Sequence, residues 1–180
     1  MSFRMPVVVF KEANSLASNG VRRMAFCMQR VQSQRNGYMS ERQQTDYIMI
    51  HCAATKPSMD ITAKDIDKWH RQKGWRKIGY HWVVCRDGTV EEGREISEVG
   101  AHCRGYNDKS IGICMVGGID EEGNPESNFT SEQWDALAKL VWQMKLPYPD
   151  AEVVGHNEFS SKACPSFNVR EWWNATEVIS

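Results

Sequence analysis

Two histidines and one cysteine have the residue types and surroundings that best support chemistry in this chain. His51 and His156 each follow a short apolar run, and Cys164 lies eight residues after His156. Imidazole nitrogen and thiolate sulfur are ligands that zinc prefers, and a catalytic zinc site keeps three protein ligands and leaves its fourth position to water. His51, His156 and Cys164 therefore make a complete ligand set for a zinc hydrolase.

Simpler interpretations exist for each of these residues taken alone. A single histidine beside an apolar run is usually a hydrogen-bonded structural residue, and a single cysteine is usually a small buried hydrophobic residue. A thiol hydrolase that uses Cys164 with His156 is another interpretation, because a cysteine just before a helix start often has a lowered pKa. Sensitivity to a chelator separates a thiol hydrolase from zinc chemistry.

The residues around the three candidate ligands occur in an order that is found in a known family. Residues 51–58 read His-Cys-Ala-Ala-Thr-Lys-Pro-Ser, and residues 156–167 begin with His-Asn-Glu and end with Ala-Cys-Pro-Ser-Phe. Further motifs lie at residues 73–81, 86–91, 100–102, 105–107, 110–113 and 116–120. Over residues 46–173 the chain resembles the zinc-dependent N-acetylmuramoyl-L-alanine amidases, the family shared by phage lysozymes and peptidoglycan recognition proteins, and it is most similar to the T-seven-type phage lysozymes. Several ordered motifs are more specific than one short pattern.

The resemblance implies one zinc ion per chain, held by His51, His156 and Cys164, and catalytic roles for Tyr80 and Lys162. We expect Tyr80 to orient or deprotonate the attacking water, and Lys162 to stabilise the oxyanion of the tetrahedral intermediate. Outside this family, Tyr80 would read as a half-buried strand aromatic and Lys162 as a solvated loop charge. Glu158 is interpreted either as hydrogen-bonding support for a ligand histidine or as a surface carboxylate.

Substrate contacts are predicted from residues on both sides of the expected groove. The predicted substrate-binding residues are Gly74, Trp75, His81, His102, Tyr106 and Asn107. Gly74 and Trp75 match the pair that, in the recognition proteins, goes with peptide stems containing meso-diaminopimelate; the alternative is a helix-stopping glycine and a core tryptophan. For His81 and His102 the alternative to lining the groove is packing beneath it.

The resemblance implies a phage endolysin that hydrolyses the amide bond between N-acetylmuramic acid and L-alanine in peptidoglycan and so lyses the host cell. A non-catalytic peptidoglycan-binding module and an additional role as an inhibitor of the phage RNA polymerase are the alternatives. The expected partner is peptidoglycan of the diaminopimelate type, and the chain is expected to be a monomer. We expect it in the host cytoplasm, with action on the cell wall in the periplasm after a separate partner permeabilises the membrane.

Composition agrees with a single enzyme domain. The chain has 180 residues, of which 41% are hydrophobic and 25% are charged, as in ordinary globular proteins. A net charge of -1 argues against nucleic-acid binding, and no apolar run approaches the length of a membrane span or a signal-peptide core. The six cysteines lack a compact disulfide spacing, so we expect free thiols, and Cys52 should face away from His51 on the strand that they share.

Strand and helix signals alternate along the chain and predict an α/β fold, with a central mixed β-sheet flanked by helices. Strands are expected at residues 47–50, 81–85, 89–92, 111–116 and 153–155, and helices at 63–73, from 130 to about 145, and after Ser166. The Asp87-Gly88 pair predicts a hairpin. Thr62 and Thr130 are expected to cap the first two helices, and Gly74 to end the first. Trp172 and Trp173 of the last helix are expected to cover the far side of the sheet.

The first 45 residues differ from the rest in charge. Seven Lys or Arg against two Glu give them a net charge of +5, so the remainder of the chain carries -6. We expect a short strand at Met5–Lys11 and a basic insert over residues 12–45, with a helical apolar stripe from Val21 to Val31. The insert is predicted to pack on the catalytic domain, residues 46–180; binding to anionic envelope surfaces and an ordinary solvated face are the alternatives.

Overall fold

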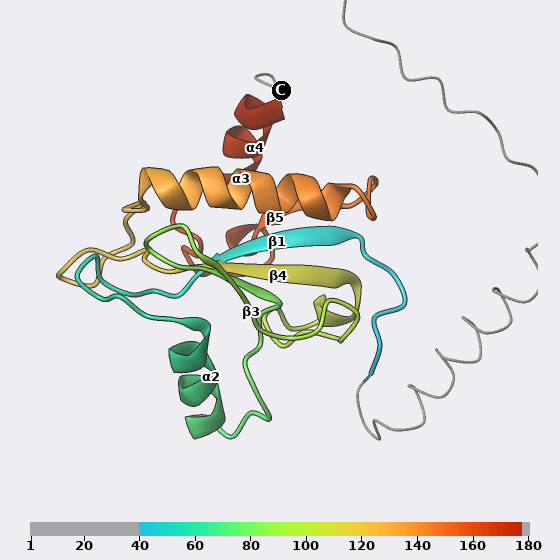
Figure 1. The fold of residues 1–180 in the computed structure, drawn as a ribbon, viewed down its shortest axis with the longest axis horizontal. Coiled ribbons are helices and arrows are strands. Elements are labelled where there is room, and N and C mark those ends of the chain that lie inside the picture. Colours follow the sequence, from blue (N-terminus) through green and yellow to red (C-terminus); the bar gives the residue numbers. More distant parts are fainter. Residues whose placement is uncertain (1–39, 178–180) are drawn as a thin grey trace, which may run out of the picture. The chain divides into compact units, whose positions relative to one another are not determined.

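The computed structural model describes residues 40–177, and these form one five-stranded mixed β-sheet with helices on both faces (Figure 1). The strands are β1 (Tyr47–Cys52), β2 (Trp82–Val84), β3 (Val90–Glu92), β4 (Ser110–Met115) and β5 (Glu152–Gly155). The predicted α/β class and mixed sheet are confirmed. The strand predicted at Met5–Lys11 and the helical stripe predicted from Val21 to Val31 lie outside the described residues.

Strand β1 lies inside the sheet, whose order is β3-β2-β4-β1-β5. It runs parallel to β4 on one side and to β5 on the other, and β2 runs parallel to β4. Strand β3 returns antiparallel to β2 through the predicted Asp87-Gly88 turn, where Gly88 has a φ of +83° that favours glycine. The four parallel strands therefore end at the same edge of the sheet, where loops from distant parts of the sequence meet.

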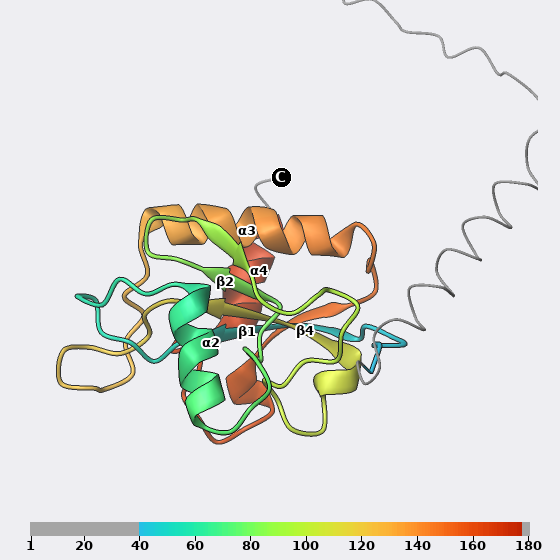
Figure 2. The same cartoon turned by 60° about the horizontal axis from the view of Figure 1, so that its bottom comes forward.

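Different helices pack on the two faces of the sheet. Helices α3 (Ser131–Lys145) and α4 (Val169–Glu177) lie over one face, and α2 (Ala63–Gln72) lies over the other (Figure 2). Ile48 and Ile50 belong to the apolar cluster that includes residues of α3 and α4. Because successive strand residues point to opposite faces, Met49 and His51 point to the face on the α2 side.

Local sequence signals explain where α2 and α3 begin and end. The Asp65 carboxylate accepts the backbone N–H of Thr62 at 2.9 Å, and Gly74 follows α2 with a φ of +84°. The Thr130 hydroxyl accepts the backbone N–H of Gln133 at 3.1 Å, and the Gln133 amide oxygen accepts the N–H of Thr130 at 3.2 Å. The capping box predicted for the second helix is confirmed.

Helix α4 begins at Val169, three residues after Ser166. Ser166 lies in a turn with a φ of +73°, and its hydroxyl donates to the Gly118 carbonyl at 2.7 Å. The side-chain oxygen of Asn168 accepts the N–H of Glu171 at 3.3 Å, so Asn168 caps the helix. Ser166 itself stays outside the helix because its side chain bonds a distant loop.

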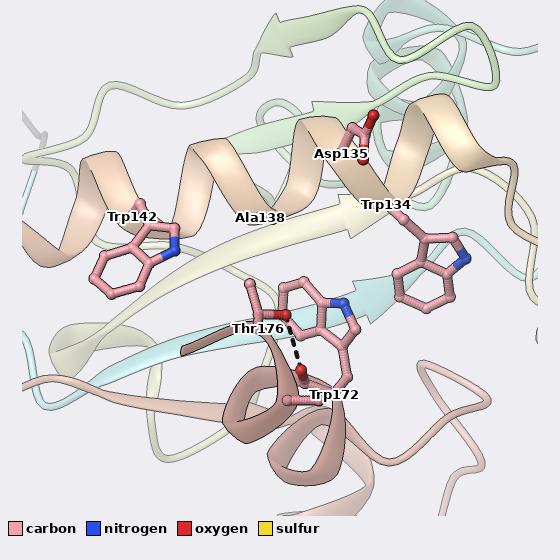
Figure 3. Close-up of a pocket in the computed structure, with 7 residues that line it drawn as sticks. Trp134, Asp135, Ala138, Trp142, Trp172 and Thr176 are labelled. Atoms are coloured by element: carbon pink, nitrogen blue, oxygen red, sulfur yellow. Dashed lines mark hydrogen bonds between the residues drawn. The ribbon is translucent and has the colours of Figure 1, made fainter. Parts of the chain in front are cut away.

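Aromatic side chains fill the contact between α3 and α4, on the face of the sheet that is away from His51. Trp173 is buried in the core, and a shallow groove between the two helices is lined by Trp134, Trp142 and Trp172 (Figure 3). The predicted role of Trp172 and Trp173 as a cover for the far side is confirmed. Within residues 40–177, no helix is long and apolar enough to cross a membrane, and the five cysteines are free thiols.

Candidate metal centre

The fold brings the three predicted zinc ligands together at one edge of the sheet. His51 lies near the end of β1, and His156 follows β5 as the first residue of the short 3-10 turn η2 (His156–Glu158). Ile50 pairs with Gly155 in the parallel register, so the two histidines are neighbours, with ring centroids 4.6 Å apart. Cys164 comes from the loop before α4. One ligand atom from each of the three residues lies within 4.8 Å of the others.

Burial prepares both histidines for a metal. Loss of hydration lowers the pKa of His51 well below its ordinary value, and His102, His156 and Lys162 lower it further. Burial, followed by the charge of Lys162, also lowers the pKa of His156. Both imidazoles are therefore neutral near pH 7 and present a lone pair. Two neutral imidazoles and one sulfur within this distance fit the ligand chemistry of zinc.

The sulfur of Cys164 is held beside the end of β1. The backbone N–H of Cys52 donates to Cys164 Sγ at 3.2 Å, and Nδ1 of His51 lies 3.8 Å from the same sulfur. The neighbouring Cys52 thiol and burial raise the pKa of Cys164, so its free thiol stays protonated and must release its proton to bind a metal.

Tyr80 and Lys162 approach the candidate ligands in different ways. The ring of Tyr80 lies 5.1 Å from the ring of His51, between centroids. Burial, followed by the Cys114 thiol, raises the pKa of Tyr80 well above its ordinary value, so its hydroxyl keeps its proton. Lys162 is exposed on the loop between His156 and Cys164, and its charge acts on both histidines. The structure therefore places the Tyr80 ring beside His51 and an exposed cation on the loop between His156 and Cys164.

Glu158 supports the turn that carries His156, and its carboxylate bonds other partners than a ligand histidine. One oxygen accepts the backbone N–H of Gly155 at 2.7 Å, and the other accepts from Nε of Arg170. The predicted hydrogen bond from a ligand histidine to Glu158 does not match this arrangement. The carboxylate closes the turn η2 and ties it to α4.

His81 and His102, both predicted as substrate contacts, lie beneath the site. His81 is 1% exposed; its Nδ1 accepts the N–H of Gly112 at 2.9 Å, and its Nε2 lies 2.9 Å from the Glu98 carbonyl. The backbone thus occupies both nitrogens of His81, which leaves none for a substrate. His102 faces the back of His51, with its Nδ1 3.0 Å from Nε2 of that ligand. The alternative of packing beneath the groove fits both residues.

The remaining predicted substrate residues include both exposed and internal groups. Trp75 is 42% exposed and packs on His70, with ring centroids 4.5 Å apart, whereas Gly74 ends α2. Tyr106 is half-buried and packs edge-on against Phe159. The side-chain oxygen of Asn107 accepts the N–H of His102 at 2.8 Å and that of Cys103 at 2.9 Å, so it holds the loop. Trp75 offers the largest exposed surface in this set.

Two residues near the site, Ser110 and Cys52, were not among the predicted site residues. Ser110 is fully buried and lies beside His102, and Cys52 contacts the Cys164 loop although it points away from His51. The only sequence signal for the first is the Ser110-Ile111-Gly112 motif, in which the serine opens a strand and the glycine leaves room for a ring. No pattern along the chain connects Cys52 with Cys164, because their contact is made between β1 and a loop.

Comparisons with known proteins agree with this geometry. The family model for N-acetylmuramoyl-L-alanine amidase matches residues 41–167. The endolysin of Klebsiella phage KP32 is 46% identical over 141 residues, and the endolysin of Escherichia phage T7 is 44% identical over 140; each match covers 78% of this chain and 93% of the relative. The solved structure of N-acetylmuramoyl-L-alanine amidase LysC from Clostridium intestinale URNW has a TM-score of 0.68 at 26% identity, over 78% of this chain and 91% of that one.

Proposed function

Because the chain belongs to the N-acetylmuramoyl-L-alanine amidase family, we propose that it is a zinc-dependent phage endolysin. It hydrolyses the amide bond between N-acetylmuramic acid and L-alanine in peptidoglycan and thereby lyses the host cell. The observation that carries the zinc dependence is the convergence of His51, His156 and Cys164 within 4.8 Å. A non-catalytic binding module is a weaker proposal, because the metal-ligand cysteine, Tyr80 and Lys162 are all present.

The chemistry divides between the metal site and two side chains. Bound zinc supplies a Lewis acid that lowers the pKa of water toward neutrality. Tyr80 keeps its proton, so we assign its hydroxyl to donate a hydrogen bond that orients the reacting groups rather than to act as a phenolate base. Lys162, at the mouth of the site, stabilises negative charge on the substrate oxygen in the transition state.

Peptidoglycan with diaminopimelate stems is the proposed substrate class. The exposed ring of Trp75 provides a flat wall beside Tyr80, since both pack on His70. We assign Tyr106, on the loop that follows His102, to the opposite wall of the groove. We also propose that the enzyme accumulates in the host cytoplasm and reaches the wall only after another protein permeabilises the membrane.

Digestion of purified Gram-negative peptidoglycan tests the proposed reaction. We expect new free L-alanine amines on the released stem peptides, loss of activity after chelation and dialysis, and recovery when zinc is added back. Mass spectrometry of the products identifies the new ends. New reducing sugar ends, or full activity in the dialysed, chelator-treated protein, would contradict the proposal. Replacing Cys164 by serine is the matched control, because it should remove metal binding and hydrolysis together.

A further inference from the structure

A second histidine, His102, contacts His51 and has no role in the proposed hydrolysis. Nε2 of His51 lies 3.0 Å from Nδ1 of His102, and the two ring centroids are 4.9 Å apart with the planes at 82°. The other nitrogen of His51, Nδ1, faces Cys164 Sγ at 3.8 Å. A neutral imidazole carries one hydrogen, on either nitrogen. The contact with His102 therefore bears on which nitrogen of His51 is free to bind a metal.

The contacts run from His51 through His102 to Ser110. The direction of these hydrogen bonds follows from the contacts of Ser110. The Ser110 hydroxyl donates to the Tyr106 carbonyl at 2.6 Å, and a carbonyl only accepts. Ser110 Oγ lies 3.4 Å from Nε2 of His102; because its own proton is used, this oxygen is left to accept from His102 Nε2–H. Nδ1 of a neutral His102 then carries no hydrogen and accepts the Nε2–H of His51. Nδ1 of His51 is left with a free lone pair.

Gly100 and Gly112 line a slot that holds the ring of His102, and their lack of a side chain leaves room for it. A Cβ atom built on Gly112 would lie 2.6 Å from Cγ and Cδ2 of His102, and one built on Gly100 would lie 2.5 Å from Cδ2. Any side chain at Gly100 or Gly112 would therefore displace the ring. The Asn107 side chain also accepts the backbone N–H of His102 at 2.8 Å, which fixes the residue from the loop side.

We propose that His102 is a positioning residue: it accepts the Nε2 hydrogen of His51 and so directs Nδ1 of His51 toward the metal. This inference rests on the proposed metal site. Metal-binding histidines usually donate their second N–H to a carboxylate, a backbone carbonyl or water. Here His102 accepts that hydrogen. Ser110, which donates to the Tyr106 carbonyl, determines which ring nitrogen of His102 carries a hydrogen.

NMR of the metal-free, full-length protein tests the hydrogen-bond direction without any substitution. Long-range proton–nitrogen correlation spectra identify which ring nitrogen of each histidine carries the hydrogen. We expect both His51 and His102 to carry it on Nε2. A hydrogen on Nδ1 of His51 in the metal-free protein would overturn the proposal. This measurement decides the matter even if substitutions at His102 do not fold.

Zinc affinity, measured by competition with a chromophoric chelator, tests the consequence for metal binding. His102→Phe fills the slot without an acceptor, so we expect a dissociation constant about 10- to 100-fold weaker. His102→Asn places an amide oxygen near the position of Nδ1 and should recover most of the lost affinity. His81→Phe is the matched control: it removes another buried histidine with two hydrogen bonds, and should lower the melting temperature of the metal-free protein while leaving zinc affinity near wild type.

Two results would overturn the inference while leaving the proposed function intact. One is a folded His102→Phe variant that binds zinc as tightly as wild type, and the other is an equal loss in the His102→Phe and His102→Asn variants. A wild-type protein that binds no zinc would instead contradict the metal site itself, while the NMR spectra would still report whether His51 donates to His102.

Discussion

At the scale of single residues, the three candidate metal ligands are separate from the two residues proposed to act on the substrate. Ligand atoms of His51, His156 and Cys164 lie within 4.8 Å of one another, whereas the Tyr80 ring lies beside His51 and Lys162 is exposed on the loop before Cys164. Tyr80 and Lys162 can therefore be changed without removing a ligand atom. Variants of Tyr80 and Lys162 therefore allow the effects on zinc binding and on substrate turnover to be measured separately.

Tyr80→Phe and Lys162→Ala should each lower turnover by about a hundredfold, the usual scale for losing an acid–base group or an oxyanion donor. Both variants should stay folded and bind zinc as wild type does. Steady-state rates on soluble muropeptide, together with zinc content, check this expectation. Near-normal turnover in both variants would assign Tyr80 to packing and Lys162 to the solvated surface.

His81 makes stability depend on pH. Burial is the main cause that lowers its pKa from 6.5 to about 4 in the folded protein. Between these pH values the unfolded chain binds a proton that the folded chain does not, so stability falls as pH falls from 6.5 to 4. The shift corresponds to about 3 kcal/mol over that window. In urea unfolding of the metal-free protein, His81→Gln should show a shallower fall across this window; an unchanged slope would contradict the assignment.

At the scale of elements, the N-terminus of α3 is fastened to the ends of two strands. The Gln133 amide donates to the carbonyls of Val84 in β2 and Val116 after β4, at 3.1 and 2.9 Å. Its oxygen accepts from Arg86 and from the N–H of Thr130. Gln133, Val84 and Val116 are all fully buried, so removing the amide takes hydrogen bonds from two buried carbonyls.

Gln133→Leu should therefore cost more stability than loss of the helix cap alone. We expect about 2–4 kcal/mol for Gln133→Leu, because buried groups lose their partners, and about 1 kcal/mol for Thr130→Ala. Ser131→Ala, on the exposed side of the same turn, is the control and should change stability by less than about 0.5 kcal/mol. Chemical denaturation measures all three. Equal effects of Gln133→Leu and Ser131→Ala would show that the amide contributes little.

At the scale of the whole molecule, residues just before the predicted boundary at 46 bond to the described domain. The described unit begins at Ser40, whose carbonyl accepts the N–H of Val99 at 2.9 Å, and the N–H of Arg42 donates to the Ser97 carbonyl at 2.6 Å. The role of the basic insert stays a proposal, as do the monomeric state and binding to phage RNA polymerase. A deletion that tests the insert should keep residues 40–45.

Deleting residues 12–39 and joining Lys11 to Ser40 by a short linker should leave hydrolysis of soluble muropeptide largely intact, because all candidate ligands lie after Tyr47. Attachment to anionic envelope material should weaken if the arginines of the insert bind there, and wild-type attachment should then fade as ionic strength rises. A deletion of residues 12–45 is the matched comparison and should be less stable, since it removes the contacts of Ser40 and Arg42. A folded protein without residues 12–39 that loses zinc and all hydrolysis would contradict this domain boundary.

The sequence alone predicted the candidate ligand set, the reaction class and most of the elements. His51, His156 and Cys164 stand in ordered motifs, and helix caps such as Thr130 with Gln133 act within four residues, where local geometry decides the outcome. The apolar run over residues 47–50 likewise predicted strand β1. These features depend on short-range chemistry, so they can be read along the chain.

Only the tertiary structure decided which groups surround the ligands. His102 meets His51 across 51 residues of sequence, and Glu158 bonds Arg170 of α4 instead of a ligand histidine. His81 has the residue type of a substrate contact, but the sheet buries it and uses both of its nitrogens. A polar side chain takes its partner from whatever packing brings within about 3 Å in a suitable direction, and that depends on distant strands and loops meeting at one edge of the sheet.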